Sequence, residues 1–213
     1  MAKQKKSRNL AALQRDIAAR AVVVETGPPR PSRSAILPDA EVVDCLISSD
    51  WQTPGALVRI LIARQNPGGP LMAGIALVDL GCLGVKDAFA RRLTTFARYQ
   101  EELLGTTDMF GPMIRADIDL AAKIIHEGVG YARSIGFEPH KDLKQFEPLL
   151  AGADPEAVTD DIPLGVDGRP FYISGPHDNA LRIMATLNAS VGEGNYRFVA
   201  GGSPDLDDLP ELG

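Results

Sequence analysis

The stretch Val78-Asp79-Leu80-Gly81-Cys82-Leu83-Gly84-Val85-Lys86-Asp87 places a thiol, two glycines, a lysine and two carboxylates where an apolar strand pattern changes to a helical pattern. Residues 75–78 are apolar at every position, which predicts an inner strand covered on both faces. Apolar residues then recur at helical spacing from Leu83 to Leu104. We therefore predict that a strand over 71–80 leads directly into a long helix, and that this junction is the candidate working site.

Similar patterns divide the rest of the chain. The segment 65–70 joins a predicted strand over 57–63 to the strand over 71–80, which indicates a hairpin with a loop. Asp167-Gly168 is the strongest turn signal, and Pro163 and Pro170 move its hairpin to a sheet edge. The remaining elements expected are a short segment over 41–47, helices over 113–135 and 143–150, a helix carrying Leu181, Met184, Leu187 and Val191, and a last strand over 195–200.

Strands that come as hairpins, with helices grouped between them, are typical of an α+β fold and not of a doubly wound parallel sheet. We predict a hairpin-built mixed sheet packed against two long helices in a single core domain. Residues 39–203 form this domain. Residues 1–38 form a basic arm, helical over 9–23, with a proline-rich linker, and residues 204–213 form an acidic tail.

The formal net charge of −6 conceals an asymmetry. Residues 1–15 carry five basic side chains and no acidic one, which leaves 17 basic against 28 acidic side chains in the rest. An acidic body repels nucleic acid, so affinity for RNA would come from the arm. Solvated chain ends are the alternative interpretation of the arm and the tail.

The chain has no signal-peptide or membrane-spanning pattern, which predicts a cytoplasmic protein without membrane association. Its two cysteines, Cys45 and Cys82, lack metal or redox spacing, and we expect both thiols to be free.

Cys82 would lie at the first turn of the predicted helix, where backbone N–H groups and the helix dipole favour a thiolate. Such a thiolate is a nucleophile if His140 or His177 supplies a base. Gly175-Pro176 would expose His177 at a helix N-terminus, with Asp178 as its cap. The alternatives are that Cys82 is a small buried apolar residue and that 175–178 is a structural turn.

Gly81, Gly84 and Lys86 form a candidate anion-binding turn, with N–H groups and an ammonium directed at a phosphate or carboxylate. Neither a P-loop nor a dinucleotide-binding fingerprint is present, and tight backbone geometry explains both glycines equally well.

Metal chemistry has little support in the sequence. His126-Glu127 begins like a zinc-protease motif, but Gly130 stands where its second histidine belongs, so that interpretation is rejected and His126 is expected at the surface. Six aspartates could assemble a magnesium site, although surface acids are the default. We predict no metal site and no cofactor. These aspartates are Asp79, Asp87, Asp142, Asp160, Asp161 and Asp178.

Three segments, 78–87, Tyr-Ala-Arg-Ser-Ile-Gly-Phe-Glu-Pro-His-Lys-Asp at 131–142, and Gly-Arg-Pro-Phe-Tyr-Ile-Ser-Gly-Pro-His-Asp-Asn at 168–179, together resemble a group of bacterial hypothetical proteins. The similarity covers about residues 50–200. It implies that the three segments belong to one domain and implies no activity.

Three functions therefore stay open. The first is a binding or accessory protein whose arm contacts RNA or a protein partner through Lys3, Lys5, Lys6 and Arg8. The second is a thiol-dependent hydrolase or transferase that uses Cys82 with His140 or His177. The third is a metal-dependent nuclease.

Overall fold

The computed structural model describes residues 40–105 and 111–200. These residues show the predicted α+β fold in one compact unit. The expected arm, its helix over 9–23 and the acidic tail lie outside the described residues. Among the described helices, none has the length and apolar character needed to cross a bilayer.

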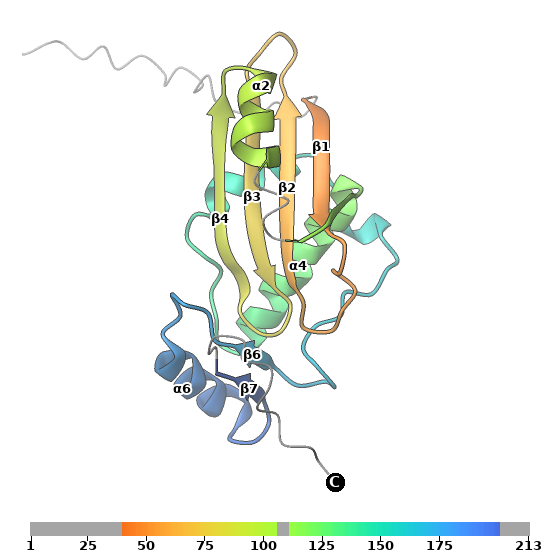
Figure 1. The fold of residues 1–213 in the computed structure, drawn as a ribbon. Helices are drawn as coiled ribbons and strands as arrows, with labels where there is room; N and C mark the ends of the chain where they lie inside the picture. The colour runs from red at the N-terminus through yellow and green to blue at the C-terminus, as the bar shows by residue number, and fades with distance from the viewer. Residues whose placement is uncertain (1–39, 106–110, 201–213) are drawn as a thin grey trace, which may run out of the picture. The chain divides into compact units, whose positions relative to one another are not determined.

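A five-stranded antiparallel sheet forms the centre of the fold (Figure 1). Its order is β4-β3-β2-β1-β5, so the first four strands follow one another as a meander. The predicted hairpin over 57–80 is confirmed, with Leu57 paired to Asp79 and Gln65 to Leu71. The strands are β1 (Glu41–Ser48), β2 (Leu57–Gln65), β3 (Leu71–Asp79), β4 (Gly84–Leu93) and β5 (Met113–Arg115).

Helices cover the two faces of the sheet unequally. Behind the sheet in Figure 1 lies α4 (Ile118–Ser134), which packs with α5 (Leu143–Phe146) and the 3-10 turn η3 (Glu147–Leu150) on the inner residues of β1 to β4. In front lie α2 (Phe96–Tyr99) and the π-helical turn η1 (Gln100–Leu104), which cover the other face at one end. A further 3-10 turn, η4 (Pro155–Ala157), follows η3.

The predicted helix over 83–104 is wrong for its first half, because residues 84–93 form β4. The apolar residues at helical spacing, Val85, Phe89 and Leu93, do not share a face of the strand. Val85 packs on the α4 side of the sheet, Leu93 packs on the α2 side, and Phe89 is 38% exposed. A bulge also lies at the start of β4. Val78 pairs with Val85 but Leu77 pairs with Asp87, so Lys86 is an extra residue. The positions of β4 that face α4 therefore shift from Val85 to Ala88.

The helix predicted over 113–135 is confirmed from Ile118 onward, whereas residues 113–115 pair with β1 as β5. Asp117 caps the helix, because its side chain accepts a hydrogen bond from the Asp119 N–H group at 3.0 Å.

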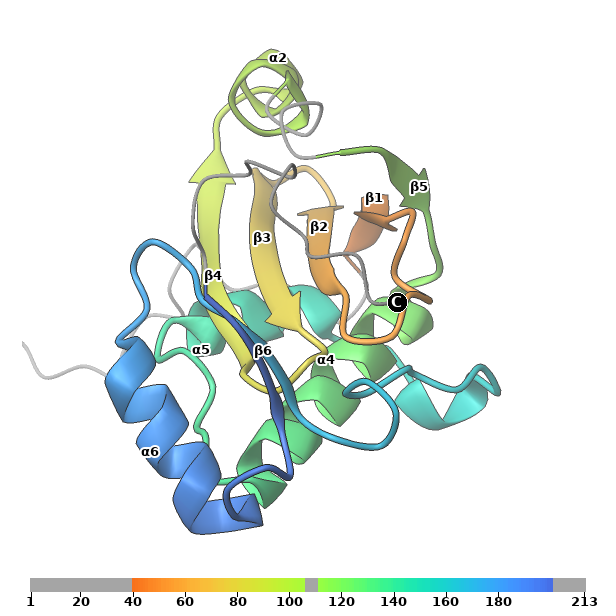
Figure 2. The ribbon, with the colours of Figure 1, turned by 60° about the horizontal axis from the view of Figure 1, so that its bottom comes forward.

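A smaller cluster of elements follows. It comprises β6 (Phe171–Ile173), α6 (Ala180–Val191) and β7 (Arg197–Val199), and Figure 2 shows β6 and α6 beside the β3–β4 turn. The helix and the last strand confirm the predictions. Asp167 and Gly168 both have positive φ and form the expected tight turn. Residues 162–166 form no strand, however, and β6 pairs in parallel with β7.

Candidate functional site

The predicted site at residues 78–87 spans the end of β3, the turn over 80–83 and the start of β4, and it does not lie at a helix start. The Asp79 side chain accepts hydrogen bonds from the N–H groups of Gly81 at 2.8 Å and Cys82 at 3.0 Å. The N–H groups that the sequence assigned to a bound anion therefore donate to a carboxylate of the protein itself.

The two glycines of this turn are required by packing. A Cβ at Gly81 would overlap the carbonyl oxygen of Phe171, and one at Gly84 would lie 2.9 Å from the carbonyl oxygen of Gly128. Gly84 also has a φ of 65°, a conformation that favours glycine. Close approach of β6 and α4 therefore accounts for both glycines without a ligand.

Cys82 is fully buried in a cluster with Tyr172 and Leu187. Burial raises the pKa of its thiol well above the ordinary range, and the nearby Asp79 carboxylate raises it further. The helix dipole that was expected to favour a thiolate is absent, because a strand follows the cysteine.

Lys86 and Asp178 form a half-buried ion pair with 2.8 Å between Nζ and Oδ2. The same carboxylate oxygen accepts the Gly175 N–H at 2.8 Å and the Tyr172 hydroxyl at 3.3 Å. Burial acts to raise the pKa of Asp178, but these donors together hold it below its ordinary value. The predicted cap is corrected: Asn179, not Asp178, caps α6 by accepting the Arg182 N–H.

Four of the predicted site residues line one cavity of about 440 Å³ between β4 and α6, namely Lys86, His140, His177 and Asp178. Cys82 is not among its lining residues. The Nδ1 atom of His140 accepts the Asp142 N–H at 3.4 Å, and it lies 3.9 Å from the carboxylate of Asp87. The structure thus gathers the histidines with the ion pair and leaves the thiol beneath the surface.

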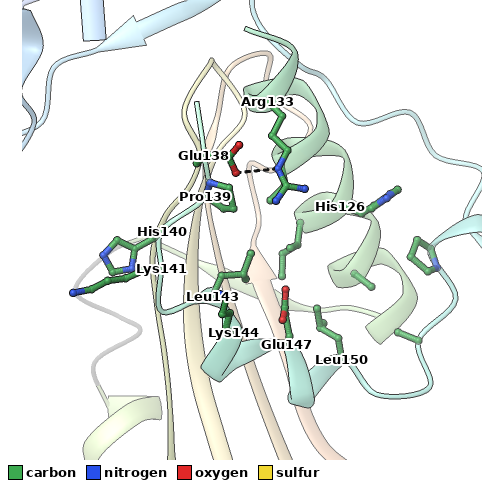
Figure 3. Close-up of a pocket in the computed structure, with 15 residues that line it drawn as sticks. His126, Arg133, Glu138, Pro139, His140, Lys141, Leu143, Lys144, Glu147 and Leu150 are labelled. Atoms are coloured by element: carbon green, nitrogen blue, oxygen red, sulfur yellow. Dashed lines mark hydrogen bonds and ion pairs between the residues drawn. The ribbon is translucent and has the colours of Figure 1, made fainter. Parts of the chain in front are cut away.

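A larger cavity lies between α4 and α5, and the sequence did not predict it. We name it the α4–α5 groove, with a volume of about 600 Å³ (Figure 3). Figure 3 shows His126 on one side, His140 and Lys141 on the opposite side, and the Arg133–Glu138 ion pair of 3.2 Å at one end. The groove is lined by Ala122, Ile125, His126, Val129, Arg133, Glu138, Pro139, His140, Lys141, Leu143, Lys144, Glu147, Leu150, Ala153 and Pro155.

The sequence contained only part of the signal for this groove. His126 and Arg133 share the polar stripe of α4, and His126 is exposed as predicted. The opposite wall comes from residues 138–155, whose position against α4 depends on how α5 packs on the sheet. No periodic pattern in the sequence predicts the position of these residues against α4.

Metal ligands do not converge in the part of the chain that the structure describes: no group of three or more His, Cys, Asp or Glu residues there could hold an ion.

Comparisons with protein-family models, with curated proteins and with solved structures found no match for this chain.

Proposed function

We propose that this protein is a non-catalytic binding protein of the cytoplasm, and that its α4–α5 groove receives an acidic segment of a protein partner. The basic N-terminal arm, with Lys3, Lys5, Lys6 and Arg8, adds positive charge to the same encounter. The groove is the observation that carries the proposal, because it combines an apolar floor with an open, cationic rim.

The floor of the groove suits apolar side chains. Ile125 and Val129 come from α4, and Leu143 and Leu150 come from α5 and η3. A peptide that lays apolar side chains into such a groove gains affinity from each buried side chain. An amphipathic segment therefore fits better than a uniformly polar one.

The charged residues at the rim determine which net charge a partner should carry. Lys141 and Lys144 are exposed, and neither forms an ion pair with another described residue. Arg133 is already neutralised by Glu138, and Glu147 is the remaining acid of the lining. The two lysines and the arm together favour an acidic partner.

A protein partner fits this lining better than RNA. Binding of single-stranded RNA depends on aromatic side chains on which bases stack, and no Phe, Tyr or Trp lines the groove. The thiol enzyme is less well supported, since Cys82 is buried and its pKa is raised. Both described cysteines are free, which fits a reducing compartment.

The test uses defined probes with the full chain. Fluorescence anisotropy would compare an acidic peptide carrying leucine at every third or fourth position, its scrambled all-polar counterpart, and an oligouridine. We expect the leucine-containing peptide to bind best. The substitution Lys144→Glu should lower the affinity for this peptide about tenfold.

Arg92→Glu is the matched control, because Arg92 is exposed on β4, forms no ion pair with another described residue and does not line the groove. Its affinity for the peptide should equal that of the unchanged protein. Preference for oligouridine would replace the protein partner with RNA, and equal effects of the two substitutions would refute the groove as the binding site.

A further inference from the structure

A third cavity lies apart from the groove, and we name it the β6 pocket. Its volume is about 360 Å³, near the lower end of the range for small-molecule sites. It shares no lining residue with the α4–α5 groove. Its lining residues are Thr53, Pro54, Gly55, Ala56, Leu57, Asp79, Lys86, Phe171, Ile173, Ser174 and Gly175.

The walls of the β6 pocket are mainly apolar. Pro54 comes from the segment before β2, Leu57 is the first residue of β2, and Phe171 and Ile173 come from β6. Leu57 and Ile173 are 51% and 50% exposed. An apolar ligand body would cover both.

Two charged residues also line this apolar pocket, Asp79 and Lys86. Asp79 is only 7% exposed, although it is a carboxylate. The N–H groups of Gly81 and Cys82 fix its orientation by donating to Oδ1. The backbone of Leu83 also donates to this carboxyl group. A carboxylate has acceptor sites for about four hydrogen bonds, so it keeps capacity for one further donor.

The charges of the pocket do not balance within the described residues. Lys86 is committed to Asp178 at 2.8 Å, and that carboxylate also has two further donors. No described cation lies within ion-pair distance of Asp79. Two carboxyl groups therefore share one ammonium, and Asp79, which lines the apolar pocket, is the one without a cation in direct contact.

We propose that the β6 pocket binds a small primary amine with an apolar body, whose ammonium group donates to Asp79. An ammonium supplies both the missing positive charge and a hydrogen-bond donor, whereas an anion would meet the unmatched carboxylate beside a lysine that is already neutralised. Burial raises the pKa of Asp79, because removal from water disfavours the ionised carboxyl group, and a bound ammonium would favour the ionised form again.

The test titrates the full chain with benzylammonium, benzyl alcohol and benzoate, three probes with one apolar body and different charge. Binding is followed by NMR through the amide signals of Gly81 and Cys82. We expect benzylammonium to bind about tenfold more tightly than benzyl alcohol, and benzoate to bind most weakly. Absence of binding by all three, or tighter binding of benzoate, would overturn the proposal.

Variants then locate the site. Asp79→Asn should reduce the affinity for benzylammonium to that for benzyl alcohol, whereas Asp160→Asn, an exposed carboxylate outside the pocket, should change nothing. Ile173→Ala removes an exposed wall residue, so the fold should survive even if that of Asp79→Asn does not. Ile173→Ala should lower the affinity for benzylammonium about threefold. Leu181→Ala, 83% exposed on α6, is its control, and equal effects of the two would refute the pocket.

Discussion

At the scale of single residues, burial and hydrogen bonding decide what each group can do. Cys82, Gly81 and Asp79 are neighbours in sequence, and each has a different role in the fold. The sulfur fills the cluster beneath α6, the glycine permits close approach of β6, and the carboxylate orders the turn. The chemistry available at this turn therefore belongs to Asp79 and not to the thiol.

Thiol labelling tests this distinction. Both cysteines are buried, and burial raises the pKa of Cys45 to about 12. We expect iodoacetamide at neutral pH to modify the folded protein at least about a hundredfold more slowly than the urea-unfolded chain, because reaction requires local opening. Rapid modification mapped to Cys82 by mass spectrometry would contradict its burial and restore the thiol enzyme.

Asp79→Asn should alter the pH dependence of stability. The folded pKa of Asp79 lies above its unfolded value of about 4, so its stabilising contribution is complete below that pH and is lost as pH rises through the folded pKa. Asparagine keeps the acceptor for Gly81 and Cys82 but does not ionise. The free energy of unfolding of the variant relative to the unchanged protein should therefore increase with pH across this window.

Urea unfolding of the variant and of the unchanged protein at a series of pH values measures this difference. The increase should amount to about 1.4 kcal/mol for each unit by which folding raises the pKa. A difference that falls with pH would mean that the folded protein stabilises the ionised carboxylate.

At the scale of elements, α4 illustrates how one helix serves two surfaces. Its buried face packs on the sheet, while its exposed side carries His126 and Arg133 of the groove. One glycine of α4 lies on each of these two sides. Gly128 faces the sheet, where an added Cβ would lie 2.8 Å from the Val78 side chain, whereas an added Cβ at Gly130 would meet nothing within 4 Å.

Alanine at these two positions should have opposite effects. Gly130→Ala should stabilise the fold by about 0.5–1 kcal/mol, because alanine has the higher helix propensity. Gly128→Ala gains the same propensity but overpacks the contact with β3, and the net loss should be about 1–2 kcal/mol. Chemical unfolding followed by circular dichroism measures both, and equal stability of the two variants would show that α4 moves to accommodate the extra methyl group.

At the scale of the whole molecule, charge is divided between the arm and the body. Residues 1–15 carry five basic side chains without an acid, whereas the rest of the chain is acidic. The proposed acidic partner would be attracted by the arm and held by the groove. Attraction through exposed charges weakens with salt, while apolar contacts in the groove do not.

Deletion of residues 1–25 should therefore weaken binding of the acidic leucine-containing peptide about tenfold at low salt and very little at 0.5 M salt. The midpoint of thermal unfolding should stay unchanged, since β1 begins at Glu41. Anisotropy titrations at both salt concentrations measure the effect. Loss of affinity that is equal at both would show that the arm acts through something other than its charge.

Local patterns were enough to predict the α+β class, the β2–β3 hairpin, the helices at α4 and α6 and the turn at Asp167-Gly168, because periodicity and turn chemistry are properties of short segments. Pairing with β3 makes residues 84–93 a strand, although the apolar residues Val85, Phe89 and Leu93 have helical spacing, because the two faces of this strand pack on different clusters. Only the tertiary structure decided that Cys82 is sealed while Asp79 lines a pocket, and that α5 and α4 enclose a groove. Burial and pairing between distant segments depend on contacts that no local pattern encodes.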